Sequence, residues 1–170
     1  MKKFLFGLIF VCISFSLSAQ RYAFVDTEYI LNNIPAYKAA QSKLNQMSED
    51  WQKEIEKEYA ILDKIYKDYQ SEKVLLTNEM IKQREAEIAA KDRAVKELQK
   101  RFFGPDGELF KKRQELIKPI QDEVYTVIKD IAESGNYAII FDTASGSNIL
   151  FTDPRYDKSD EVLEKLGYKN

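Results

Sequence analysis

The sequence predicts an α+β protein that is mostly α-helical, in which a long antiparallel helical hairpin is built on a small body that contains β-strands. Residues 36–103 include no glycine and no proline, and 27 of these 68 residues are charged. Because glycine and proline disfavour helix interiors most strongly, their absence permits nearly continuous helix. Apolar segments typical of strands lie on both sides of this zone. One straight helix over 36–103 would extend about 100 Å, so we expect much of the chain to project from a small core.

Residues 1–19 are typical of a secretory signal peptide. Lys2 and Lys3 precede an apolar run at 4–11, and small residues follow up to Ala19. We expect cleavage near Ala19 and export of the mature chain. The alternative is an uncleaved membrane anchor, which is disfavoured because the apolar run is shorter than the ~20 residues that span a bilayer.

The composition argues against an enzyme and against a metal site. Cys12 is the only cysteine and the chain has no histidine, so the mature protein has neither a disulfide nor a Cys–His or Ser–His nucleophile. The thiolate and imidazole ligands that dominate zinc and copper sites are missing as well. The sequence also has no glycine-rich phosphate loop and no calcium-loop spacing. We therefore expect no catalytic residue, no cofactor and no metal.

Two aspartates could still be read as a paired-carboxylate acid/base site. Asp26 and Asp142 each end a predicted strand, and two such carboxyl groups could act as those of a glycosidase do. Aspartates at strand ends cap helices and turns far more often. We favour the capping role for both residues.

The net charge gives no sign of a nucleic-acid partner. Without Lys2 and Lys3 the chain has 24 basic and 28 acidic residues, which gives a net charge of 24 − 28 = −4. A protein with this balance has no overall positive field that would attract a phosphate backbone.

A strand and a short helix precede the long charged zone. Residues 21–26 form the strand candidate, and residues 27–33 follow as about two helical turns. Ile34-Pro35 marks a break, because the residue before a proline avoids helical dihedral angles and proline suits the first turn of a new helix. We assign residues 20–35 to the body.

The C-terminal region, residues 135–170, also belongs to the body. Strand candidates at 137–142 and 148–152 are joined around Gly146, which is a β-hairpin signal.

Residues 157–166 are predicted to close the chain as a short helix. Ser159 or Asp157 is its expected N-cap, and Gly167 is its expected stop.

In the long zone the apolar residues follow a coiled-coil stripe with steps of three and four. Its members are Tyr37, Ala40, Leu44, Met47, Trp51, Ile55, Tyr59, Leu62, Tyr66, Tyr69 and Leu76, with Lys73 as its one polar member. The successive steps of four through Tyr59 predict a stutter, which locally unwinds a left-handed supercoil. A weaker stripe follows on the returning segment: Ile81, Ile88, Val95, Leu98, Phe102, Leu109, Leu116, Ile120, Val124, Val127 and Ile131.

The hairpin arm comprises residues 36–134, and we expect its tip at 75–78. This position gives two arms of nearly equal length, and Thr77 or Asn78 can cap the returning helix. A tip at Gly104–Gly107 would leave most of the first helix without a partner. The Gly-Pro-Asp-Gly segment is then a break within the returning helix, acting either as a hinge or as a fixed bulge.

The body that these elements predict is too small to close around a core of its own. Three short strands and a small helix cannot close a barrel, although the strands are rich in apolar residues. The simplest solution is oligomerisation, in which strands from several copies build one core. The candidate residues for this association are Phe24, Val25, Ile139, Ile140, Phe141 and Leu150.

The order of these elements resembles the Skp/OmpH family of periplasmic chaperones. The similarity covers the mature chain and is carried by the opening strand at 22–26, the charged helical hairpin, the segment at 137–142 and the last helix at 157–166. The segment at 114–120 is similar to the stretch where the returning arm of that family enters the body.

The resemblance implies a homotrimer with a small β-barrel body shared between chains and with three helical arms that enclose a cavity. It implies an ATP-independent holdase that binds unfolded outer-membrane proteins in the periplasm. The best-known member is strongly basic, whereas residues 36–103 carry 14 basic and 13 acidic side chains here. Contact with lipopolysaccharide or a membrane surface therefore stays open.

The aromatic residues of the arm are the candidates for contact with such clients. They are Tyr59, Tyr66, Tyr69, Phe102, Phe103 and Phe110. The alternative is that the aromatic residues of the stripe pack between the two helices. A different class of function, a structural or adaptor coiled-coil protein of the cell envelope, would explain the heptad pattern equally well.

Overall fold

The structure is a computed structural model that describes residues 21–144, 146 and 149–168. The predicted signal peptide lies outside these residues. Two compact units are present, one formed by the described parts of Met1–Asn33 and Val124–Asn170, the other by Ile34–Glu123. The second unit is shorter than the predicted arm at 36–134, because Val124 and Ile131 are buried in the first unit.

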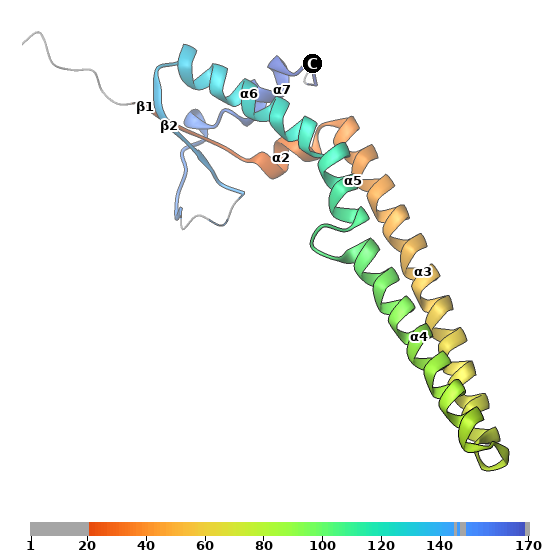
Figure 1. Cartoon of the computed structure of the whole chain (residues 1–170). Helices are drawn as coiled ribbons and strands as arrows, with labels where there is room; N and C mark the ends of the chain where they lie inside the picture. Colours follow the sequence, from red (N-terminus) through yellow and green to blue (C-terminus); the bar gives the residue numbers. More distant parts are fainter. Residues whose placement is uncertain (1–20, 145, 147–148, 169–170) are drawn as a thin grey trace, which may run out of the picture. The chain divides into compact units, whose positions relative to one another are not determined.

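The unit Ile34–Glu123, which we call the arm, is an antiparallel helical hairpin. Figure 1 shows one long helix lying alongside two shorter helices that return in the opposite direction. The elements are α3 (Pro35–Glu72), the 3₁₀ turn η1 (Lys73–Leu75), α4 (Asn78–Phe103), α5 (Glu108–Leu116) and the first residues of α6 (Lys118–Ser134).

Local sequence determines where the first helix begins and where the chain reverses. Pro35 occupies the first helical position of α3, where its missing N–H has no intrahelical partner to lose. After η1 the chain turns, and Thr77 caps α4 because its Oγ1 accepts a hydrogen bond from the Met80 N–H (3.3 Å). Glu79 lies in the first turn of α4, where the helix dipole favours a negative charge.

The contact between α3 and the returning helices differs from the predicted stripe in one region. Tyr59 and Tyr66 are exposed, whereas Glu58 and Ile65 are half-buried. Beyond Ile55 the residues that face α4 follow alternating steps of three and four, so the predicted stutter through Tyr59 is wrong. A charged residue can take such a position because the Glu58 carboxylate pairs with the Lys91 ammonium of α4.

The Gly-Pro-Asp-Gly segment is a compact turn that separates α4 from α5 (Figure 1). The Gly107 N–H donates to the carbonyl oxygen of Gly104 (2.9 Å). A Cβ atom on Gly107 would lie only 2.7 Å from the carbonyl oxygen of Phe102 and 2.9 Å from that of Arg101. The turn therefore requires glycine at this position because the backbone passes too close for a side chain.

The other unit, which we call the body, contains a two-stranded parallel sheet. β1 (Arg21–Val25) pairs with β2 (Tyr137–Asp142), with Tyr22 opposite Ile139 and Phe24 opposite Phe141. The remaining elements are α2 (Thr27–Asn32), the C-terminal part of α6, η2 (Pro154–Tyr156) and α7 (Ser159–Lys165). Its buried apolar side chains are Ala23, Val25, Ile30, Val124, Ile131, Val162 and Leu163.

Hydrogen bonds from polar side chains fix the ends of the body elements. Asp26 caps α2 by accepting from the Tyr29 N–H (2.8 Å), and its own N–H donates to Ser159 Oγ (2.8 Å). The Asp142 carboxylate accepts from the Thr27 N–H (3.2 Å) and from Thr27 Oγ1 (2.8 Å). Both strand-terminal aspartates thus have structural roles: the Asp26 carboxylate caps α2 locally while its N–H reaches Ser159, and the Asp142 carboxylate accepts from Thr27, far away in the sequence.

The last helix, α7, begins at Ser159 with Lys158 as its N-cap, so the predicted N-cap at Ser159 or Asp157 is wrong, whereas Gly167 stops the helix as expected. Asp157 Oδ1 accepts from the Ser159 N–H (2.8 Å) and from Ser159 Oγ (2.6 Å) at its start. At its end Gly167 adopts φ +80°, and the Tyr168 N–H donates to the carbonyl oxygen of Leu163 (2.9 Å). This is the left-handed helix stop that favours glycine.

The predicted β-hairpin after Tyr137 is wrong in this chain. Residues 149–152 form no strand, and among the described residues the sheet has only β1 and β2. Leu150 is 100% exposed and Phe151 is 82% exposed, and no strand in the described part of the chain pairs with this segment. Asn148, where the second strand was expected to begin, lies outside the described residues.

None of the helices in the described part of the chain is both long enough and apolar enough to cross a membrane.

Replacing Gly107 with alanine is expected to destabilise the arm by about 1–3 kcal/mol, because the new Cβ atom would collide with two backbone carbonyl groups. Thermal unfolding followed by circular dichroism would measure the loss. Replacing the exposed neighbour Pro105 with alanine is the matched control. An unchanged melting temperature for Gly107→Ala would contradict the close approach described here.

Candidate functional site

One face of the body sheet is apolar and open. Side chains alternate between the two faces of a strand, so Tyr22 and Phe24 share a face with their partners Ile139 and Phe141. The opposite face carries the buried Ala23 and Val25. On the open face, Tyr22, Ile139 and Phe141 are each between 44% and 48% exposed, and the rings of Tyr22 and Phe141 lie 6.5 Å apart.

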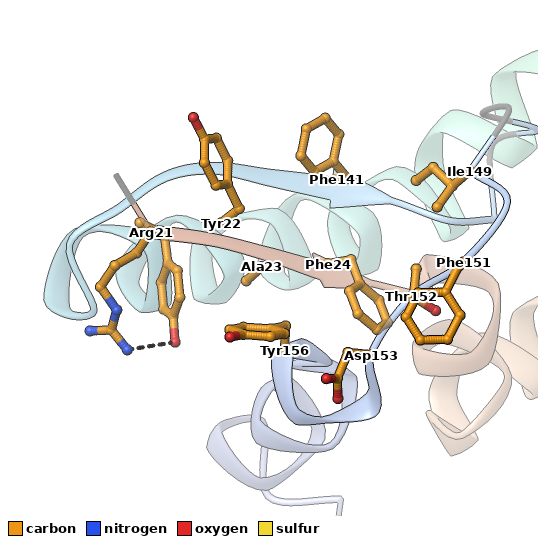
Figure 2. A pocket seen from close by; sticks show the side chains of 11 residues that line it. Arg21, Tyr22, Ala23, Phe24, Phe141, Ile149, Phe151, Thr152, Asp153 and Tyr156 are labelled. Carbon is orange, nitrogen blue, oxygen red and sulfur yellow. Dashed lines mark hydrogen bonds between the residues drawn. The ribbon is translucent and has the colours of Figure 1, made fainter. Parts of the chain in front are cut away.

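The loop after β2 and the turn η2 border this face and form a groove with it. Figure 2 shows the aromatic side chains of β1, β2 and η2 around this groove. Its volume is about 670 Å³. The residues that line it are Arg21, Tyr22, Ala23, Phe24, Tyr137, Phe141, Ile149, Phe151, Thr152, Asp153 and Tyr156. Most of these side chains are apolar or aromatic, so the groove fits an apolar surface better than a charged ligand.

The two charged residues that line the groove, Arg21 and Asp153, have partners within the chain, and so does Lys158 outside the lining. Arg21 donates to the hydroxyl of Tyr137 (3.3 Å), as the dashed line in Figure 2 shows, and its Cζ lies 4.7 Å from the centre of that ring. Arg155 donates to Asp153 (2.6 Å), and this hydrogen bond lowers the pKa of the Asp153 carboxyl group. Lys158 donates to Glu161 (2.8 Å), which raises the pKa of its ammonium group.

The two strand-terminal aspartates, the candidates for an acid/base pair, have structural partners in the described part of the body. The carboxylates of Asp26 and Asp142 accept hydrogen bonds from backbone N–H groups, as caps and turns do. Within the described ranges no cluster of three or more acidic, histidine or cysteine side chains could hold a metal ion. The chemistry of this site is therefore that of an apolar contact surface.

The six residues predicted to mediate self-association differ in their exposure. Val25 is buried within its own chain, and Phe24 and Ile140 are half-buried. Ile139, Phe141 and Leu150 are exposed and available to a partner.

Sequence reasoning missed four further side chains at the open face, namely Tyr22, Ile149, Phe151 and Tyr156. Strand alternation could have found Tyr22, since it is two residues before Phe24.

The arm has its largest aromatic contact beside the Gly104–Gly107 turn. The rings of Trp51 and Phe102 stack with centres 4.9 Å apart and an angle of 8° between their planes. Phe103 meets the same indole edge-on at 6.3 Å. Ile55, Val95 and Leu98 pack against this cluster.

The predicted client-binding residues also fall into two groups. Tyr69 and Phe102 are buried, and Phe103 is half-buried, so these three pack inside the arm. The exposed residues are Tyr59, Tyr66 and Phe110.

Two of these tyrosines make hydrogen bonds across the hairpin. The Tyr59 hydroxyl donates to Gln99 Oε1 (3.4 Å), and the Tyr69 hydroxyl donates to Glu85 Oε1 (2.6 Å). Lys73 lies 5.2 Å from the centre of the Tyr69 ring. Its pKa is raised, first by its interaction with Tyr69 and to a smaller extent by Glu85.

The tip of the arm is apolar, which sequence reasoning did not single out. Val74 is 88% exposed and Leu75 is 82% exposed. The uncharged run at 74–78, located where the chain reverses, was the available signal.

Together these features define a class: a protein with a coiled-coil-like helical hairpin and a small sheet whose apolar face is open. The family model described as "Outer membrane protein (OmpH-like)" matches residues 21–166. The chain therefore belongs to the OmpH-like family, as the resemblance in the sequence indicated.

A solved structure has the same fold. It is the crystal structure of an OmpH-like protein from Caulobacter crescentus, described as a candidate outer membrane chaperone. The match has a TM-score of 0.66 at 16% sequence identity, and it covers 89% of this chain and 86% of the other. No curated protein matches this sequence.

Replacing Trp51 with alanine is expected to destabilise the arm by about 3 kcal/mol. This is the lower end of the range for truncating a buried aromatic residue, because Trp51 is half-buried. Urea unfolding followed by circular dichroism would measure the change. Replacing the exposed Tyr66 with alanine is the control, and it should change stability by no more than about 0.5 kcal/mol. Equal losses of unfolding free energy for the two variants would contradict a stabilising role of the stacked aromatic cluster.

Proposed function

We propose that this protein is an ATP-independent holdase chaperone of the periplasm, which binds unfolded outer-membrane proteins and prevents their aggregation. Membership of the OmpH-like family supports this role, and the similar structure from Caulobacter crescentus is described as a candidate outer membrane chaperone. The observation that carries the proposal is that one chain has both an open apolar sheet face and a long, solvated helical arm.

The active form is a homotrimer whose three bodies share one core. The open face with Ile139 and Phe141, together with the exposed Leu150 and Phe151, is the surface that other copies cover. An exposed apolar patch next to an unpaired strand edge is an aggregation hazard unless a partner covers it. In the trimer, residues 149–152 pair as strands with a neighbouring chain, which accounts for their lack of a partner within one chain.

The arms of the trimer surround the client and hold it by many weak contacts. An unfolded β-barrel protein exposes alternating apolar residues and unpaired strand edges. The exposed Tyr59, Tyr66 and Phe110 offer aromatic surface along the arm, and the surrounding charged residues keep that surface soluble. Each contact is short-lived, but several arms together retain the client through a high effective concentration. Release then needs no nucleotide, because no single contact is strong.

A structural or adaptor role in the cell envelope is the second candidate. The unbroken helix α3 favours it, since a long coiled-coil surface can pair with a fixed partner. The Gly104–Gly107 turn disfavours it, because this turn interrupts the opposite helix. Native mass spectrometry distinguishes the two roles: an open trimer with one unfolded client supports the holdase, and a dimeric rod with a fixed partner supports the adaptor.

The charge-introducing variant Ile139→Asp/Leu150→Asp is expected to lose self-association while its helical content is retained. Both side chains are exposed in one chain, so the substitutions should not disturb its own core. Size exclusion with light scattering would give the molar mass, with a shift from trimer to monomer as the expected result. Val74→Asp, which also adds a charge at an exposed apolar position, should remain trimeric. A well-folded monomeric wild-type protein at micromolar concentration would contradict the shared core.

An unfolded outer-membrane β-barrel diluted out of urea should stay soluble in the presence of a stoichiometric amount of this protein without ATP. Light scattering would follow the aggregation. The variant Tyr59→Ser/Tyr66→Ser/Phe110→Ser should bind the client at least about tenfold more weakly, since a combined loss of only about 1.4 kcal/mol has this effect. Tyr125→Ser, at another exposed tyrosine, is the control. Precipitation of the client at the rate seen without the protein would refute the holdase.

A further inference from the structure

The helices of the arm are held together unevenly along its length. At one end Ala40, Leu44 and Ile117 form a buried cluster, and further along Ile55, Val95 and Phe102 form a second. Beyond Ile55 and before Val95, Tyr69 is the only buried side chain of α3 and α4. We call this segment, residues 58–92, the outer arm.

Polar contacts take the place of a buried core in the outer arm. The Glu58–Lys91 ion pair crosses from α3 to α4 with both side chains about one third exposed, and Tyr69 donates to Glu85. The remaining charged pairs across the hairpin are Lys73–Glu85 at 3.8 Å and Arg84–Glu72 at 3.7 Å, and their side chains are exposed. Exposed ion pairs contribute little to stability, because water and salt screen them.

The outer arm nevertheless carries apolar side chains along its inner side. Four of these side chains are half-buried, namely Leu62 and Ile65 of α3 and Ile81 and Ile88 of α4. The buried Tyr69 follows Ile65 by four residues and so belongs to the same side of α3. Regions with few buried apolar contacts and many solvated hydrogen bonds open locally at low cost. Separating α3 from α4 here would expose these side chains without disturbing either buried cluster.

The neighbouring elements limit how far such an opening can extend. The stacked Trp51 and Phe102 hold the C-terminal end of α4 against α3. The Gly104–Gly107 turn then separates α4 from α5, so movement of α4 is not transmitted along a continuous helix. We therefore expect an opening of the outer arm to stop at the contact between Trp51 and Phe102.

We propose that the outer arm opens at the Glu58–Lys91 ion pair and that its apolar inner side chains, Tyr69 among them, then bind unfolded client segments. This inference rests on the proposed holdase function and deepens it, because it names the surface that the client meets. It gives the buried Tyr69, one of the predicted client-binding residues, a route to contact with a client. Opening and client binding are coupled, since a client that covers these side chains stabilises the open form.

Hydrogen exchange measured by mass spectrometry on the full protein without client tests the opening. Backbone amides of the outer arm should exchange at least about tenfold faster than those of residues 37–55 and 109–120. Replacing the ion pair with Glu58→Leu/Lys91→Leu should slow the exchange of the outer arm, because a packed apolar pair commonly equals or exceeds a partly buried ion pair in stability. Equal exchange along the whole arm, or no response to this variant, would overturn the proposal.

Covalent closure tests whether clients use the opened surface. In a chain with Cys12→Ser, the pair Glu58→Cys/Lys91→Cys is joined by a short bis-maleimide, so the outer arm stays closed. The matched control is Lys43→Cys/Glu115→Cys, which joins α3 to α5 in the part of the arm that contains the Ala40, Leu44 and Ile117 cluster. We expect the outer link to weaken client retention about tenfold relative to the same variant without the linker, and the control link to have no effect.

The outcomes separate the two ideas. Full client protection by the protein with the outer link would overturn the proposal and leave the holdase function intact. Failure of every form, linked and unlinked, to retain a client would refute the holdase function and with it client binding by the outer arm. Uniform hydrogen exchange would refute the opening alone.

Discussion

The parallel pairing of β1 with β2 is the constraint on which the rest of the structure depends. These strands come from opposite ends of the described chain, and every helix of the arm lies between them in the sequence. A parallel pair always needs a crossover connection, which is usually a single helix. Here the crossover is the entire helical hairpin. Bringing such distant strands together costs loop-closure entropy, which the sheet and its side-chain hydrogen bonds must offset.

The hydrogen bonds around the sheet show how that cost is offset. Asp142 accepts from Thr27, Ser159 accepts from the N–H of Asp26, and the Lys158 N–H donates to the carbonyl oxygen of Phe24 (2.9 Å). Each bond joins the first strand or the residues just after it to the C-terminal region. Held at its ends in this way, the sheet of the described residues is only two strands wide, and one of its faces remains open.

The sequence was sufficient to predict the family and the helical hairpin, because both depend on features of the chain itself. The absence of glycine and proline over 36–103 and a capping threonine before Glu79 are local signals that need no knowledge of a partner. Asp26 and Asp142 are likewise hydrogen-bonded as caps and turns, as their positions after strands suggested.

The incorrect predictions concern residues whose exposure or secondary structure depends on which other residues they contact. Tyr59 and Tyr66 fit the spacing of the predicted stripe but are exposed, whereas Glu58 lies inward because Lys91 is opposite it. A single sequence does not reveal that Glu58 and Lys91 lie opposite each other. Residues 149–152 are rich in the apolar residues that strands favour, yet a strand forms only beside a partner, and among the described residues no strand pairs with them. The sequence thus indicates that a segment favours the strand conformation, but it does not indicate which strand pairs with it.

The position of Trp51 has a practical consequence. It is the only tryptophan of the chain, and its indole is stacked on Phe102 beside the glycine turn. When the protein is excited at wavelengths that its ten tyrosines do not absorb, its emission therefore originates from a single known location on α3. Its colour and intensity depend on how much water reaches the indole. The molecule thus carries an intrinsic optical probe of its own hairpin, and no dye needs to be attached to follow it in real time.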